Sequence, residues 1–312
     1  MTVDFSQMPA SCILPGDTSR GFRDPAVFFY EDVFYCYYSY VTPAPDGFTD
    51  FRLGLSTSRD LIHWSEPMLF TQLDRTKNYS SPGCILAHNG EFVMCMQTYP
   101  TDGNAPGKVF GNQNSRIYLM RSHDLIHWSE PELMRVHGDG VSFEQMGRMI
   151  DPYILPDHDD PQRYFVFYKQ PPRDAVPRRT PSGYPVEYMS YSSTRDLIHF
   201  TYEGAIECGE NVCVLFHNNE YRIYHSPQNG IGCIHTRDFR TCTQDEPLTL
   251  GQAHWAWARD RVTAGFVLDA TLIPGVGKYL LFFNGDRNDA FPFCANIGLA
   301  WSDDLANWNY VE

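Results

Sequence analysis

A short segment that recurs five times constrains this chain more than any other feature. The stretch STSRDLIHWSEP at 56–67 returns as MRSHDLIHWSEP at 120–131, and weaker copies end at Phe200, Phe239 and Trp308. Copies spread along almost the whole chain indicate five similar structural units rather than two unrelated halves. Because no low-complexity linker separates the copies, we expect a single domain over residues 1–312.

Each copy follows strand-like runs in a fixed order. A short run with a small or acidic residue at its head comes first, and a turn and an aromatic alternating run such as EFVMCMQTY (91–99) follow it. A third run, for example RLGLSTS (52–58), leads into the copy, and a fourth short strand can come after it. About four antiparallel strands per unit make a propeller blade, so the sequence predicts an all-β fold, a five-bladed β-propeller.

The predicted blades are separated by turn-rich segments. They cover approximately residues 21–69, 79–136, 148–206, 209–248 and 265–312. The segment before residue 21 is expected either to close the ring or to cap it. Aromatic residues make up 15% of the chain beside 22 Pro and 23 Gly, a composition that favours short strands and turns over a helix bundle.

The DLIHW copies themselves are expected to be scaffold. Their Asp can bond backbone amides in a turn, while Leu and Trp pack between blades. His63, His127 and His199 repeat with this scaffold. We therefore expect them to be turn or surface residues rather than catalytic groups or ligands.

The formal net charge of −14 at pH 7 restricts the partners. Nucleic acid and anionic membranes require clustered Lys and Arg, so neither is expected, and a neutral or cationic partner is favoured. The N-terminal stretch MTVDFSQMPASCILPG lacks a signal-peptide pattern, and no apolar run is long enough to span a membrane. The simplest expectation is a cytoplasmic protein.

Nine cysteines are scattered along the chain without a CxxC pair of zinc-site spacing. Most are expected to be small buried side chains. This scatter fits a reducing compartment better than a disulfide framework.

The heads of the first strands carry the residues most relevant to function. In a propeller these strands line the central channel, so their heads converge on one funnel. The five blades contribute Asp24, Ser81, Asp151, Glu210 and Asp269. Carboxylates gathered around a partly closed axis repel one another, which is costly unless function or a cation requires them.

A single Asp-Pro pair more often initiates a turn than marks a site. Here two pairs, at 24–25 and 151–152, stand in register, and each precedes an apolar strand and a DLIHW copy. This repetition favours a shared pocket. Other acids, namely Asp32, Asp157, Asp159 and Asp160, fall in the following turns and are expected to be solvated.

Three segments carry a resemblance to a known family. They are RDPAVFFYEDVFYCYYS (23–39), IDPYILPDHDDPQRYFVFYK (150–169) and GENVCVLFHNNEYRIYHS (209–226). With the five-blade rhythm, they make the chain resemble glycoside hydrolase family 43 and its five-bladed relatives, including family 32, over nearly its full length. The resemblance implies that Asp24 is the general base, Asp151 the aspartate that tunes and orients the acid, and Glu210 the general acid.

This assignment agrees with the chemistry of glycoside cleavage. One protonated carboxyl must give a proton to the departing oxygen, and one ionised carboxylate must act across the ring. A third acid near Glu210 is expected to raise its pKa and keep it protonated. Glu207 is an alternative acid, but its place before Cys208-Gly209 looks like the end of the preceding blade, so Glu210 is preferred.

The chain departs from the family at the head of blade five. Family 43 members often carry a histidine there, associated with a metal near the axis, whereas this chain has Asp269. An aspartate could ligate calcium or bond a sugar hydroxyl, but no further ligands can be identified. No cofactor is expected to be required, and a structural calcium ion near the channel axis stays an open alternative.

Sugar recognition usually combines an aromatic platform with polar groups. The segment GQAHWAWARDRV (251–262) interrupts the blade pattern, so we expect His254, Trp255 or Trp257 to reach over the funnel. Core packing is an equal alternative for the tryptophans. Ser81 and Arg287 are further candidates for substrate contact.

The resemblance implies an exo-acting, inverting glycosidase that releases a terminal pentose, α-L-arabinofuranose or β-D-xylose, from an oligosaccharide. A retaining, family 32-like fructosidase is an alternative, although the chain has Arg23-Asp24-Pro25-Ala26 where that family has Asn-Asp-Pro-Asn-Gly. A non-catalytic carbohydrate-binding propeller would not need the complete acid set. A sialidase would need clustered arginines, which the sequence does not reveal.

Overall fold

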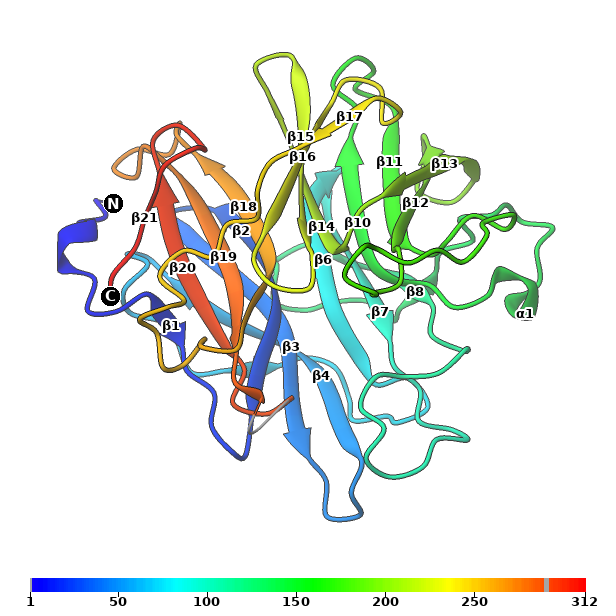
Figure 1. The fold of residues 1–312 in the computed structure, drawn as a ribbon, viewed down its shortest axis with the longest axis horizontal. Coiled ribbons are helices and arrows are strands. Elements are labelled where there is room, and N and C mark those ends of the chain that lie inside the picture. The colour runs from blue at the N-terminus through cyan, green and yellow to red at the C-terminus, as the bar shows by residue number, and fades with distance from the viewer. Residues whose placement is uncertain (1, 289–291) are drawn as a thin grey trace.

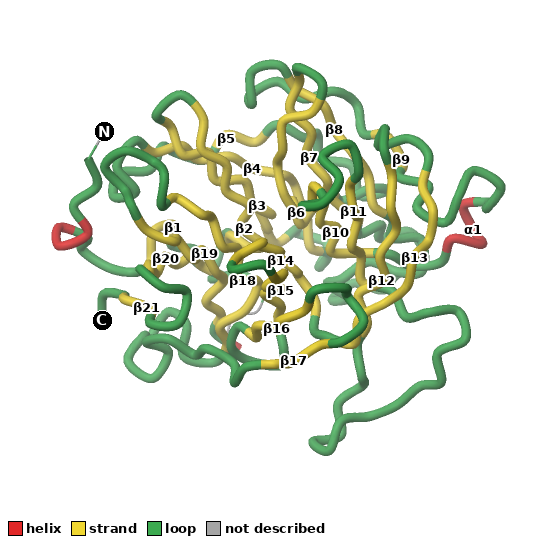
Figure 2. The backbone as a smooth tube through the Cα atoms, turned by 90° about the horizontal axis from the view of Figure 1, so that it is seen from above, coloured by secondary structure: helices red, strands yellow, loops and turns green. Residues whose placement is uncertain are grey.

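The computed structural model describes residues 2–288 and 292–312, and its strands form five antiparallel sheets, seen from the side in Figure 1. The first strand of each sheet contacts the first strand of the next, and the fifth contacts the first. These first strands lie at the centre and the last strands at the rim (Figure 2). The predicted all-β, five-bladed propeller is therefore confirmed.

The strands of the five blades follow one another along the chain. Blade one contains β2 (Gly21–Tyr30), β3 (Val33–Pro43), β4 (Thr49–Ser58) and β5 (Met68–Leu69). Blade two contains β6 (Tyr79–His88), β7 (Glu91–Thr98), β8 (Ile117–Ser122) and β9 (Glu132–Leu133). Blade three contains β10 (Ile150–Pro156), β11 (Tyr164–Lys169), β12 (Tyr188–Thr194) and β13 (Phe200–Glu207). Blade four contains β14 (Glu210–His217), β15 (Glu220–Ser226), β16 (Gly232–Thr236) and β17 (Cys242–Gln244).

Blade five is built from both ends of the chain. It contains β18 (Arg261–Ala270), β19 (Lys278–Asp286) and β20 (Asn296–Ser302), with β1 (Cys12–Leu14) and β21 (Trp308–Asn309) both paired to β20. Of the two roles considered for the N-terminal segment, the structure shows ring closure. The blade also begins at Arg261 rather than at residue 265, because β18 starts inside the segment that interrupted the repeat.

In the part of the chain that the structure describes, helical structure is confined to short segments. The structure has a 3-10 helix, Phe5–Gln7, and one helix of a single turn, α1 (Phe143–Met146), in the connection between blades two and three. Neither helix has the length or the apolar character that crossing a membrane requires. All nine cysteines are free thiols, and seven of them are buried.

The DLIHW copies form tight turns, as predicted. In blade one Asp60 Oδ1 accepts hydrogen bonds from the backbone N–H groups of Ile62 (2.9 Å) and His63 (2.8 Å), while Leu61 is fully buried. Leu61 adopts a left-handed φ of 65°, and the corresponding residues of the other blades, Leu125, Leu197, Phe239 and Leu305, do the same. His63 is exposed and bonds Asp60, in agreement with a scaffold role.

Not every turn acid is solvated as predicted. Asp32 is exposed, but Asp157 is only 5% exposed. Asp157 accepts hydrogen bonds from Arg163 (2.5 Å) and from the Tyr221 hydroxyl of the next blade (3.2 Å). The prediction for Asp157 is wrong, because this acid joins blades three and four.

A left-handed residue marks the head of every first strand. The φ angles are 54° at Asp24, 45° at Ser81, 54° at Asp151, 53° at Asn211 and 51° at Ala264. The ladder to the second strand is irregular at the same place in each blade. Non-glycine residues in this region cost of order 1–3 kcal/mol each and persist only where surrounding structure holds them. The repeated bulge turns five side chains toward the axis.

This register corrects the assignments in blades four and five. Asn211 occupies the shared position in blade four, and Glu210 precedes it by one residue. In blade five the position belongs to Ala264, so the prediction for Asp269 is wrong. Asp269 lies near the other end of β18, where it is exposed and accepts hydrogen bonds from the backbone (3.0 Å) and hydroxyl (2.6 Å) of Thr271.

Candidate active site

A cavity of about 210 Å³ opens at the heads of the first strands. It is lined by Arg23, Asp24, Phe51, Ser81, Tyr99, Phe110, Arg148, Ile150, Asp151, Lys169, Glu210, Asn211 and Arg261. All five blades contribute to this lining. The fold therefore brings together four residues singled out in the sequence, namely Asp24, Ser81, Asp151 and Glu210.

Asp24 is held from three blades. Its Oδ2 accepts hydrogen bonds from the hydroxyls of Ser39 (2.8 Å) and Ser81 (2.9 Å), and its backbone N–H donates to Asn284 Oδ1 (2.8 Å). Burial raises the pKa of Asp24 above its usual range, and Arg23 and the two hydroxyls only partly offset this effect. The result is a well-fixed carboxyl that faces the cavity.

Asp151 is the most buried of the three acids, at 5% exposure. Its Oδ1 accepts a hydrogen bond from Asn211 Nδ2 (3.2 Å), whereas Oδ2 has no hydrogen-bond partner in the described part of the chain. Burial, and then the negative charge of Glu210, raise the pKa of Asp151 well above its usual range. These surroundings favour a protonated Asp151.

Glu210 has the opposite surroundings. Its Oε2 accepts a hydrogen bond from Lys169 Nζ (2.5 Å), and its Oε1 accepts one from Arg261 Nη2 (3.3 Å). Burial alone would raise the pKa of Glu210, but Lys169 and Arg261 outweigh burial and lower the pKa to about 2. The expectation that a third acid would keep Glu210 protonated is thus wrong for the free protein, because the sequence did not reveal these two cations.

Basic residues gather at the cavity of an otherwise acidic protein. Arg23, Arg148, Lys169 and Arg261 line it. Arg23 forms a buried ion pair with Asp286 (2.9 Å). Within residues 2–288 and 292–312, the guanidinium of Arg148 has no hydrogen bond or ion pair, although its charge counteracts the raised pKa of Asp151. The sequence did not reveal this cluster, since its members come from three different blades.

An aromatic wall lies beside the acids, but not where the sequence placed it. Phe51, Tyr99 and Phe110 line the cavity, and Tyr99 packs against Phe51 (5.5 Å between ring centroids) and Phe110 (5.6 Å). Phe51 lies on β4, and Phe110 lies in the long connection between β7 and β8. That connection is long compared with its counterpart in blade four, which was a signal available in the sequence.

The residues of segment 251–262 do not form this wall. Trp255 is only 3% exposed, donates its indole N–H to the Val311 carbonyl (2.9 Å) and stacks on Trp257 and Phe283. The prediction that Trp255 contacts substrate is therefore wrong, and its alternative, core packing, holds. His254 is exposed, and Arg287 is half-buried. Neither one is among the residues that line the cavity.

Glu207, the alternative acid, lies away from the three carboxyls. It ends β13, its side chain is 52% exposed, and it forms an ion pair with Arg178. Glu207 borders a separate pocket of about 340 Å³, together with Glu187 and His225. The structure thus favours Glu210 as the acid that belongs with Asp24 and Asp151.

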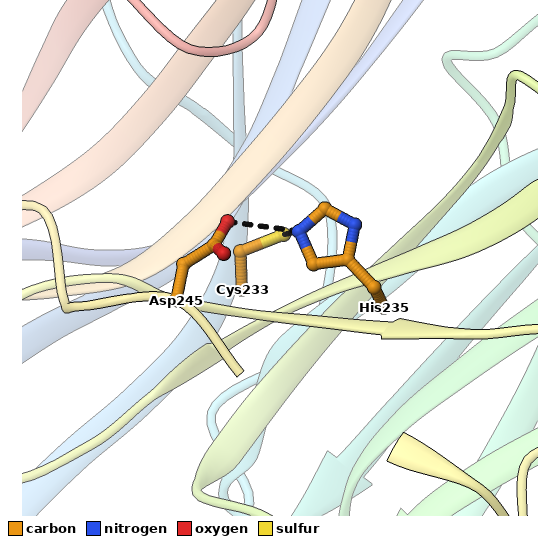
Figure 3. A group of neighbouring side chains, drawn as sticks. All are labelled: Cys233, His235 and Asp245. Atoms are coloured by element: carbon orange, nitrogen blue, oxygen red, sulfur yellow. Dashed lines mark hydrogen bonds and ion pairs between the residues drawn. The ribbon is translucent and has the colours of Figure 1, made fainter. Parts of the chain in front are cut away.

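One group of metal-ligand type occurs in the described part of the chain, and it lies outside the cavity. Cys233, His235 and Asp245 point toward one another in blade four (Figure 3). Both ring nitrogens of His235 already face carboxylates, Glu220 at 2.7 Å and Asp245 at 2.8 Å. Burial lowers the pKa of His235, but these two bonds outweigh it and raise the pKa. A protonated imidazole between two carboxylates accounts for this group.

Asp269, the residue that the sequence offered as a calcium ligand, does not lie at the axis. The space below the acids has a volume of about 30 Å³. Its lining includes Asp24, Ser81, Asp151 and Asn211 beside Pro25, Pro82, Pro152, Val212 and Phe266. Calcium takes six to eight oxygen ligands, and a structural calcium ion near the axis stays a prediction. We therefore derive no chemical step through a metal.

Solved structures with the same architecture extend over almost the full length of the chain. A glycosyl hydrolase from Bacteroides ovatus has a TM-score of 0.65 at 14% identity, with 100% of this chain and 96% of that chain covered. The β-xylosidase RS223 has a TM-score of 0.62 at 12% identity, with 94% and 96% covered.

A third structure is CoXyl43, a GH43 β-xylosidase/α-arabinofuranosidase from a compost microbial metagenome, in complex with xylotriose. It has a TM-score of 0.60 at 13% identity, with 97% of this chain and 98% of that chain covered. No protein-family model and no curated protein sequence matches the chain. The chain therefore has the five-bladed propeller fold of these glycoside hydrolases, family 43 included.

Proposed function

We propose that this protein is a glycoside hydrolase that releases a terminal pentose, α-L-arabinofuranose or β-D-xylose, from an oligosaccharide with inversion of configuration. The observation that carries the proposal is the convergence of Asp24, Asp151 and Glu210 on one cavity with an aromatic wall. Because the narrow channel closes the base of this cavity, it suits the end of a sugar chain better than a continuous chain.

In the proposed reaction Asp24 activates water and Glu210 protonates the leaving oxygen. Inversion requires the two carboxyls to stand roughly 6.5–9.5 Å apart, so that water fits between base and sugar. Glu210 is ionised in the free protein, so it must acquire a proton when substrate binds. A sugar that fills the cavity removes water from Glu210, and desolvation favours the protonated form. Asp151 completes the set as a buried carboxyl whose surroundings favour the protonated form and whose Oδ1 accepts a hydrogen bond from Asn211.

Arg148 favours a second candidate, a glycosidase whose substrate carries a carboxylate. Arginine binds carboxylates through two parallel hydrogen bonds, and Arg148 faces the cavity without an ion-pair partner among the described residues. Hydrolysis of a hexuronide in preference to the neutral sugar of the same configuration would support this candidate over the pentosidase.

The test is a panel of aryl glycosides assayed at several pH values with wild-type protein, Asp24→Asn and Asp269→Asn. We expect pentosides to be the best substrates and Asp24→Asn to lose about 10²–10⁴-fold in turnover with an unchanged unfolding midpoint. Asp269→Asn is the matched control, because Asp269 is exposed near the other end of β18, and it should keep full turnover.

Two results would contradict the proposal. One is that no glycoside is hydrolysed while sugars still bind, which would favour the non-catalytic propeller. The other is near-wild-type turnover by Asp24→Asn. NMR detection of the first-formed anomer tests inversion, and a retained product would favour the fructosidase-like alternative.

A further inference from the structure

The second strands of four blades supply the same hydrogen bond near the axis. In each of these blades, the second strand carries a neutral side chain opposite the residue just before the left-handed residue of the first strand. This side chain accepts a hydrogen bond from the backbone N–H of the left-handed residue in the next blade. These pairs are Ser39 with Ser81 N–H (2.7 Å), Gln97 with Asp151 N–H (2.5 Å), Ser226 with Ala264 N–H (2.8 Å) and Asn284 with Asp24 N–H (2.8 Å). The repeat thus uses one acceptor per blade to hold the next head.

Blade three departs from this pattern. Its residue at the same place is Lys169, which lies opposite Ile150. An ammonium group has three donors and no acceptor, so Lys169 cannot hold the next head. Among residues 2–288 and 292–312, no side chain accepts a hydrogen bond from the Asn211 backbone. Lys169 Nζ instead donates to Glu210 (2.5 Å) and to Glu187 (2.7 Å).

We propose that Lys169 is a positioning residue for the proposed glycosidase reaction: it holds Glu210 as a carboxylate in the free protein, and it releases Glu210 but keeps Glu187 when a sugar enters the cavity. This inference rests on the proposed function. Glu187 belongs to the connection between β11 and β12, and its side chain is 30% exposed. Lys169 therefore keeps one carboxylate partner when it leaves Glu210.

The charged groups around Glu210 act on its ionisation in opposite directions. Lys169 on β11 and Arg261 on β18 stabilise its carboxylate, whereas Asp151 on β10 and Asp24 on β2 oppose it. Arg23 and Arg148 also line the cavity. Burial lowers the pKa of Lys169, but Glu210, Asp151 and Glu187 raise it above its usual range. Lys169 is thus charged throughout the pH range in which Glu210 titrates.

Lys169→Gln and Glu187→Gln separate this role from a structural one. Lys169→Gln gives blade three the residue that blade two has at Gln97 and restores an acceptor for Asn211, so it should fold. Without the ammonium ion, the pKa of Glu210 should rise by roughly 1–3 units. Glu187→Gln removes the second carboxylate partner of Lys169, so Lys169 pairs with Glu210 alone. The pKa of Glu210 should then fall or stay at its low value. Lys169→Arg keeps the charge and serves as the control.

The primary measurement is a ¹³C NMR titration of glutamate-labelled protein, with the Glu210 signal assigned by Glu210→Gln. This measurement needs no substrate. On a pentoside with a poor leaving group, kcat/KM depends on the small fraction of free protein in which Glu210 is protonated and Asp24 is ionised. A higher Glu210 pKa in Lys169→Gln enlarges this fraction, so kcat/KM at neutral pH should rise in step with the shift that NMR measures.

An unchanged Glu210 titration in Lys169→Gln would overturn the inference, as would shifts of the same sign in Lys169→Gln and Glu187→Gln. Failure of the proposed function looks different. In that case the NMR shifts appear as expected, but wild-type protein hydrolyses no glycoside in the panel. This result would overturn the role of Lys169 in a glycosidase reaction, and the Lys169–Glu210 ion pair would have a structural role alone.

Discussion

Two neighbouring carboxyls at the cavity have opposite electrostatic surroundings. Asp151 is buried with one oxygen unpartnered in the described chain, while Glu210 is bonded by two cations. Environments that push two pKa values apart are how proteins assign acid and base roles to the same type of side chain. At the scale of single residues, the protonation of each carboxyl depends more on the groups that contact it than on whether the residue is Asp or Glu.

Glu210→Ala should cost most where the leaving group needs a proton. On a natural disaccharide, whose alkoxide leaves poorly, we expect a loss of about 10²–10⁴-fold in kcat. A nitrophenyl glycoside of the same sugar should lose much less, because nitrophenolate departs without help. Glu207→Ala is the matched control, since Glu207 is exposed and paired with Arg178. Steady-state rates on both substrates test this, and equal losses in Glu210→Ala would contradict the acid role.

The sequence located the three acids because repetition aligns the heads of the first strands. It could not reveal Lys169 or Arg261 as partners of Glu210. Lys169 ends one strand and Arg261 begins another, 41 and 51 residues away along the chain. Such partners depend on strand register and on neighbouring blades, and neither is readable from local pattern. Asp269 was misplaced for the same reason, by an error in where β18 begins.

At the scale of elements, the DLIHW turn is the most predictable part of the molecule. Its sequence specifies its own hydrogen bonds, since Asp60 bonds residues only two and three positions away. Local bonds of this type need no information about the rest of the fold. The closing strand β1 is the contrary case, because it precedes the first copy and joins a blade at the other end of the chain.

Asp60→Asn should make the free energy of unfolding less dependent on pH in the acidic range. Burial raises the pKa of Asp60, but bonds from His63, Ile62 and Ser58 outweigh it and lower the pKa to about 2. With an ordinary value of about 3.9 when unfolded, Asp60 stabilises the fold above about pH 4, and this contribution disappears as pH falls toward 2.

Urea unfolding at pH 7, 4 and 2.5 measures this effect. The wild-type protein should be more stable than Asp60→Asn at pH 7, and the difference should shrink at pH 2.5. Asp32→Asn, in an exposed turn, is the control and should differ little from wild type at each pH. A pH-independent difference for Asp60→Asn would contradict the expectation.

At the scale of the whole molecule, the first strands approach one another too closely for side chains at some points. A Cβ at Gly83 would lie 1.5 Å from the Pro152 carbonyl oxygen of the next blade. Gly83→Ala should therefore force blades two and three apart. Overpacking of this kind costs about 1–3 kcal/mol or more. Gly140→Ala is the control, because a Cβ there meets nothing within 4 Å. Thermal unfolding should show a lower midpoint only for Gly83→Ala.

The way blade five is assembled has a mechanical consequence. β1 lies beside Ile297–Gly298 of β20 and β21 beside Trp301–Ser302, so a force applied between the two ends of the chain acts on a single sheet (Figure 1). That sheet would unzip first. It carries Asn284, which holds the Asp24 backbone, and Arg261, which bonds Glu210. A stretched molecule would thus lose the geometry of its candidate active site while its other four blades were still intact.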